Sequence, residues 1–176
     1  AFDAALRRFA GNYRLDGSGN CDVVYEWDTP VEGSTRQIVE ISDFQLVDFV
    51  LDAPAILGRD QLRSRQVRAK GKIALDGAHC ELDHLVLTTE VGDLDVSGLL
   101  SLDDLASGGT QGMLHALQND DYSLNGHLDL ARLAKLLPGT LRIRPGTELA
   151  SGNVTLQLAS HREGNRRKWD GKLTSS

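Results

Sequence analysis

Residues of metal-ligand type gather in one short segment, His79-Cys80-Glu81-Leu82-Asp83-His84. The segment reads as part of a β-strand, in which side chains alternate between two faces. His79 and His84 are five positions apart and therefore point to opposite faces, whereas Cys80 and His84 share one. A zinc site needs three or four ligands. We therefore predict no metal site here, and no motif calls for a cofactor.

Two acidic segments, residues 103–104 and 119–121, lack the alternating oxygen ligands and the bidentate Glu of a calcium loop, so we predict solvated loops. The Gly-Ser-Gly at residues 17–19 lies on an alternating segment and not before a helix, unlike a phosphate-binding loop. No nucleophile elbow or dinucleotide-binding glycine pattern occurs. The 25 acidic residues include no pair that the sequence singles out for catalysis. We predict no catalytic residue and no enzyme. A hydrolase with a polar pocket is the third-ranked hypothesis.

The strongest signal for a structural element surrounds Gly98. Apolar residues at 94, 96, 100 and 102 alternate with polar ones, and this period of two predicts a strand with one apolar face. The same glycine-centred pattern recurs around Gly71, Gly126 and Gly152, at steps of 27, 28 and 26 residues. A nearly constant step is typical of a repeating β architecture.

The whole chain therefore predicts a mostly β fold, an antiparallel curved meander of glycine-centred repeats with two or three short helices. Expected helices are residues 1–10, 112–118 and 129–137, the last with Asp129 as its N-cap and Pro138-Gly139 as its stop. Residues 55–65 read either as a short helix or as an irregular crossing. Residues 13–27 read either as one long strand or as a hairpin turning at 17–20. The other expected strands are residues 37–41, 44–51, 67–75, 80–89, 94–102, 122–130, 140–143, 151–160 and 168–174.

The composition bounds the class of protein. The 176 residues fit a single β-rich domain spanning 1–176, which we expect to be a segment of a longer protein. The net charge is −6, and no run of basic residues is long enough to bind along a phosphate backbone. Nucleic acid is therefore not an expected partner. Cys21 and Cys80 form either a disulfide or two buried thiols.

The apolar strand face is the positive feature of this sequence. It either closes as a core or stays open as a groove for an apolar ligand, and periodicity alone favours the core. The candidate lipid-binding residues on it are Val96, Leu100, Leu128, Leu130, Val154, Leu156 and Leu158.

Two segments resemble the AsmA-like family. The segment Gly126–Leu158 combines a strand pattern, a leucine-rich helix pattern, a proline and a strand of the form L-x-S-G-x-V-x-L-x-L. The segment Leu82–Leu102 contains the run L-x-x-L-x-L-x-T-x-x-G-x-L-x-V-x-G, which is similar to the repeated hairpins of that family. Together they cover about a third of the chain.

The resemblance implies a protein of the bacterial periplasm or cell envelope, membrane-anchored through a segment that this sequence lacks. It implies lipid transport or outer-membrane maintenance through an apolar β-sheet groove, with phospholipid or fatty acid and neighbouring repeats of the same chain as partners. The alternative is a structural or protein-interaction β module without a ligand, which associates through exposed edge strands.

Overall fold

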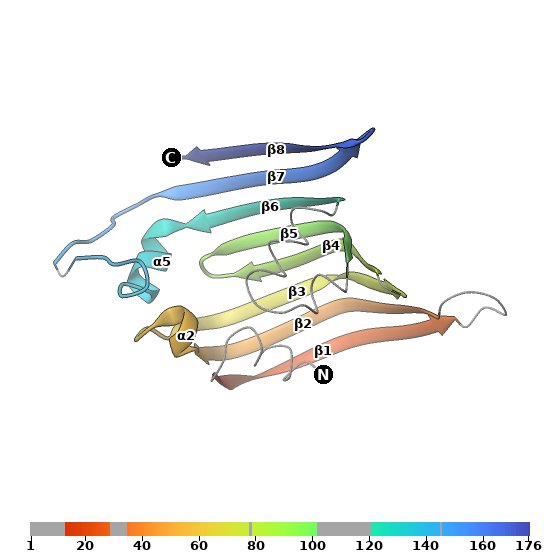
Figure 1. Cartoon of the computed structure of the whole chain (residues 1–176). Coiled ribbons are helices and arrows are strands. Elements are labelled where there is room, and N and C mark those ends of the chain that lie inside the picture. Colours follow the sequence, from red (N-terminus) through yellow and green to blue (C-terminus); the bar gives the residue numbers. More distant parts are fainter. Residues whose placement is uncertain (1–12, 29–34, 78, 102–120, 145) are drawn as a thin grey trace.

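The computed structural model describes residues 13–28, 35–77, 79–101, 121–144 and 146–176. These residues form one eight-stranded antiparallel sheet in which each strand pairs with its neighbours in the chain, from β1 at one edge to β8 at the other (Figure 1). The strands are β1 (Arg14–Asp28), β2 (Arg36–Asp52), β3 (Leu62–Asp76), β4 (His79–Thr89), β5 (Gly92–Ser101), β6 (Asp121–Asp129), β7 (Asn153–Glu163) and β8 (Arg166–Ser175). The expected antiparallel meander is confirmed.

The first two strands are longer and more continuous than short alternating runs suggest. β1 is one strand, because Gly17 makes an irregularity between Asp16 and Ser18 and not a turn, and Gly19 pairs regularly with Leu46. β2 runs unbroken from Arg36 to Asp52, so the expected break at residues 42–43 is wrong. Those two residues instead form a bulge against β3, which keeps the apolar residues on both sides of it on one face.

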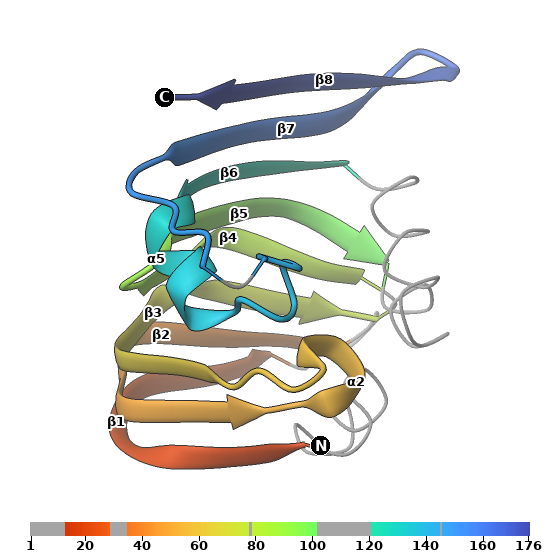
Figure 2. The same cartoon turned by 90° about the vertical axis from the view of Figure 1, so that its left-hand side faces the viewer.

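Two short helices lie at the end of the sheet where β2 ends and β3 begins (Figure 2). The first, α2 (Pro54–Leu57), is a single turn, and α5 (Leu130–Leu136) follows β6 directly. Asp129 caps α5 as predicted, because its Oδ1 accepts a hydrogen bond of 2.9 Å from the Arg132 amide. Ala53, Leu57 and Leu137 form a small buried cluster that joins the two helices.

Other expectations differ from the structure. The strand expected at residues 140–143 is wrong, since these residues form turns after α5, where the Leu141 amide bonds to the Leu137 carbonyl. Helices expected at residues 1–10 and 112–118 lie outside the described residues. Within the described part, only α5 exceeds one turn, so two or three helices is slightly more than is seen.

The four evenly spaced glycines do not occupy equivalent positions. Gly71 and Gly98 lie within β3 and β5, Gly126 lies within β6, and Gly152 precedes β7. Gly98 has a φ of +145°, and a Cβ there would lie 2.4 Å from the Asp121 carbonyl oxygen, so the backbone of β6 approaches too closely for any side chain. A Cβ at Gly71 would likewise lie 2.7 Å from the His84 carbonyl oxygen, whereas no atom comes closer than 3.4 Å at Gly126 and Gly152, so only two of the four glycines leave room for a neighbouring backbone.

Candidate functional site: the apolar face of the sheet

One face of the sheet carries apolar residues in rows that run across all eight strands. Residues directly opposite in neighbouring antiparallel strands share a face, so the strand registers trace each row. The central row contains, from β1 to β8, Cys21, Phe44, Ala69, Leu87, Leu94, Gly126, Leu156 and Leu173. We call the face with this row the apolar face and the opposite one the polar face.

Six of the seven predicted lipid-binding residues lie together on the apolar face. Leu128 is directly opposite Val154, and Val96 and Leu158 are both opposite Leu124. Leu156 is in the central row, and Leu100 lies opposite Cys80. The seventh, Leu130, is not on a strand, because it is the first residue of α5.

Much of the apolar face remains accessible to solvent. The exposed fraction is 37% for Leu156, 38% for Leu87 and 69% for Leu173. Single exposed apolar residues are ordinary, but apolar residues that occupy consecutive strands in one row make a continuous patch. In the described part of the chain, this face is therefore partly open to solvent, although Val67, Cys80, Tyr122 and Ser160 on it are buried.

Charged and hydrogen-bonding residues cover the polar face. Its central row contains Asn20, Gln45, Arg68, Thr88, Asp93, His127, Thr155 and Thr174. His127 lies beside Asp93, with Nδ1 3.7 Å from a carboxylate oxygen, and His84 lies beside Asp95 at 3.2 Å. Pairs of this kind on a solvated surface contribute little to stability.

The expected sharing of a face by Cys80 and His84 is wrong. A bulge in β4 between Leu82 and Leu85 reverses the alternation, and His84 has a φ of +45°. Cys80 therefore lies on the apolar face, whereas His84 pairs with Asp95 on the polar face. Among the described residues, no group of three or more His, Cys, Asp or Glu side chains is placed to hold a metal.

The two cysteines are free thiols on strands that are not neighbours, with Cys21 exposed on β1 and Cys80 buried on β4. The expectation that both are buried is wrong for Cys21. Burial raises the pKa of the Cys80 thiol. Cys80 is 8% exposed and lies between Leu75 and Leu100, so it acts as a small packing residue.

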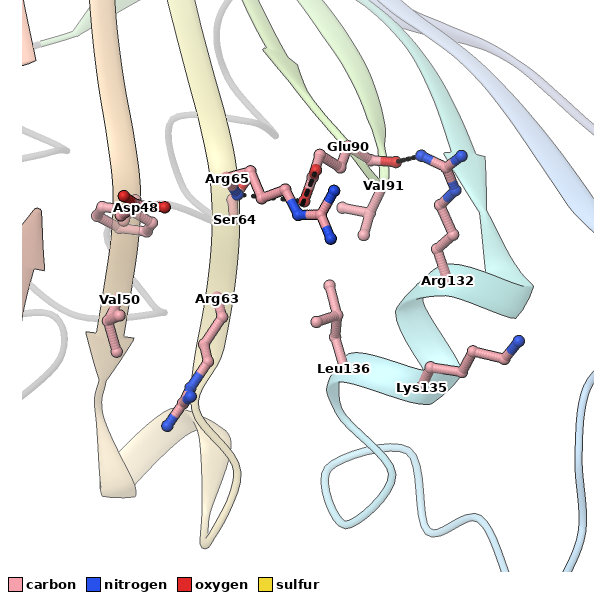
Figure 3. Close-up of a pocket in the computed structure, with 11 residues that line it drawn as sticks. Asp48, Val50, Arg63, Ser64, Arg65, Glu90, Val91, Arg132, Lys135 and Leu136 are labelled. Atoms are coloured by element: carbon pink, nitrogen blue, oxygen red, sulfur yellow. Dashed lines mark hydrogen bonds and ion pairs between the residues drawn. The ribbon is translucent and has the colours of Figure 1, made fainter.

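A pocket of about 680 Å³ lies where α5 meets β2, β3 and the turn between β4 and β5 (Figure 3). Leu136 points from α5 toward Val91, and Phe49 and Val50 add apolar surface. The basic residues of the lining are Arg63, Arg65, Arg132 and Lys135.

Each basic residue of this pocket already has a polar partner. The Arg65 guanidinium lies 4.0 Å from the Glu90 carboxylate, the Arg132 guanidinium donates to the Glu90 carbonyl oxygen, and Arg63 donates to Gln61. Lys135 lies 3.4 Å from Glu148. The pocket therefore offers apolar walls surrounded by basic side chains that already have polar partners, and sequence periodicity missed it because its residues come from four separate segments.

The comparisons with known proteins found no match. No family model, curated protein or solved structure matches it. The resemblance to the AsmA-like family therefore stays a prediction that rests on the sequence patterns. No helix in the described residues is long and apolar enough to span a membrane.

Proposed function

We propose that this chain is a lipid-handling segment of an AsmA-like envelope protein, in which the apolar face shields acyl chains. The supporting observation is the central row, because it runs across the whole sheet while its members on β4, β7 and β8 remain 38%, 37% and 69% exposed. Each methylene that such a surface removes from water contributes about 0.8 kcal/mol. Binding of this kind accumulates along the chain of the ligand and does not select one lipid type.

The proposal places the protein in the bacterial periplasm or envelope, with phospholipid or fatty acid as its ligand. A membrane anchor and further repeats belong to the same proposal. The opposite polar face supports it, because a sheet that is apolar on one side and solvated on the other has one surface for lipid and one for water.

The test is native mass spectrometry of the purified protein, followed by organic extraction and identification of any bound lipid. Leu156→Asp puts a charge in the middle of the apolar face and is expected to abolish lipid retention. Leu99→Asp is the matched control, because Leu99 lies on the polar face with an exposed fraction of 46%. Lipid that remains on a folded Leu156→Asp variant would contradict the proposal.

A structural module without a ligand is the second candidate function. The observation that favours it is the pair of sheet edges, since within the described residues β1 pairs only with β2 and β8 only with β7. This candidate predicts a mass without any adduct. The extraction experiment therefore separates the two functions.

A further inference from the structure

The two edges of the sheet are open and carry opposite charge. All fifteen residues of β1 are exposed, with Trp27 at 68%, and every residue of β8 except Arg167 is exposed as well. β1 contains four acidic residues and one basic residue, whereas β8 contains four basic residues and one acidic residue. Open edges present unpaired backbone groups that readily accept another strand.

The backbone groups at both edges are compatible with each other. Ser176 and Asn153 exchange two backbone hydrogen bonds of 2.9 and 3.1 Å, so the even-numbered residues of β8 bond to β7 and the odd-numbered ones point outward. The strand registers allow the same alternation to be followed from β8 to β1. In β1, the backbone N–H and C=O groups of the odd-numbered residues from Gly19 to Trp27 also point away from the sheet.

The faces match in the same way. The odd-numbered residues of both strands lie on the apolar face, among them Cys21 and Leu173. The central row begins at Cys21 and ends at Leu173, and the row that begins at Tyr25 ends at Trp169. A second copy that places its Cys21 opposite Leu173 therefore also places its Tyr25 opposite Trp169 and continues both rows of the apolar face.

The same register pairs opposite charges on the polar face. It places Asp22 of one copy opposite Lys172 of the other, Glu26 opposite Lys168, and Asp28 opposite Arg166, all of them exposed residues. A shift of two residues either way destroys this match, because Asp170 then faces either Glu26 or Asp22. Opposite charges across an antiparallel ladder stabilise it, and like charges destabilise it.

We propose that a second copy of this chain docks edge to edge, with the β8 of one copy pairing antiparallel to the β1 of the next. The contact uses two different surfaces, so it leaves one free edge at each end and builds open-ended chains of copies with a continuous apolar face. This inference goes beyond lipid handling and does not rest on it.

The test is sedimentation velocity of the protein over a range of concentrations and salt. The unaltered protein is expected to self-associate, more weakly as salt rises. Lys168→Glu with Lys172→Glu makes both edges acidic, and Asp22→Lys with Glu26→Lys makes both basic. For each double variant alone, the association constant is expected to fall by about tenfold or more. Arg142→Glu with Arg144→Glu, in the segment after α5, is the control with the same change in net charge as the lysine variant and is expected to associate normally.

Mixing the two edge variants provides the decisive measurement. In the mixture, the acidic edges of one variant pair with the basic edges of the other. An equimolar mixture is therefore expected to associate as strongly as the unaltered protein. This recovery also shows that neither variant failed to fold. A monomeric unaltered protein, edge variants that associate normally, or a mixture that stays dissociated overturns the proposal.

Discussion

The indole of Trp169 on β8 contacts the ring of Tyr122 on β6 edge to face, with centroids 6.1 Å apart and planes at 84°. The two residues are not on neighbouring strands, because Ser160 of β7 lies between them in the same row. Ser160 is small and only 2% exposed, so the two rings meet above it. This contact fixes the last hairpin to the rest of the sheet on the apolar face.

The Tyr122 hydroxyl contributes nothing to this contact. It is buried, and within the described residues it has no hydrogen-bond partner. A buried hydroxyl without a partner carries a desolvation cost of about 1–3 kcal/mol. Tyr122→Phe keeps the ring and is therefore expected to raise the free energy of unfolding by about 1 kcal/mol in urea titrations. A loss of stability in this variant indicates a hydrogen bond to the hydroxyl.

Gly98 and Gly126 give a matched test of close backbone approach. Gly98→Ala forces a Cβ against the backbone of β6 at a φ of +145°, and is expected to lower the free energy of unfolding by about 1–3 kcal/mol. At Gly126 the nearest atom to such a Cβ is 3.4 Å away, so Gly126→Ala is expected to change it by less than about 1 kcal/mol. Equal effects in urea titrations contradict this account.

Asp129 determines where α5 begins. Asp129→Ala removes the acceptor for the Arg132 amide and is expected to cost about 1 kcal/mol of stability. Asp129→Asn retains the oxygen acceptor while it removes the charge next to the Arg132 guanidinium. It is therefore expected to stay close to the unaltered protein in thermal unfolding, unless the exposed ion pair and not the cap holds the helix.

The buried Cys80 thiol and Tyr122 hydroxyl predict a loss of stability at alkaline pH. Burial raises the pKa of Cys80 and of Tyr122, so at high pH both groups ionise more readily in the unfolded chain than in the folded one. At neutral pH both groups are protonated in both states and the free energy of unfolding has its full value, which falls as the pH rises past about 9. Cys80→Ala is expected to flatten this fall, measured by urea titration at several pH values.

Ellman's reagent gives a separate check on the two thiols at neutral pH. Cys21 is exposed and is expected to react rapidly, whereas Cys80 is expected to react only after denaturant is added. Two rapidly reacting thiols in the folded protein contradict the burial of Cys80.

Alternation predicted most of the sheet, and local irregularities account for what it missed. The period of two around Gly98 identified β5 and the hairpin before it, because strands with one apolar face leave a clear pattern. The bulges at residues 42–43 and 83–84 break that period without ending a strand, so β2 was divided and His84 was assigned to the wrong face. A single extra residue reverses every later position, and sequence alone does not show which strand absorbs it.

The candidate site was likewise predictable in part. The apolar face was predictable, because six of its seven named residues follow strand periodicity. Leu130 was misplaced because α5 begins where the strand pattern is still intact. The pocket beside α5 was not predictable, since it depends on how that helix packs against Val50 and Val91, which belong to distant segments.

The strictly sequential order of the strands also has a mechanical consequence. Each strand is held by the strands before and after it in the chain, and the outer two are each held by one ladder alone. Force applied to the edges therefore acts on β1 and β8 first and detaches the strands one after another from the edges inward. Such a sheet yields in small successive steps and re-forms in the reverse order, because each strand pairs again with a neighbour that is still in place.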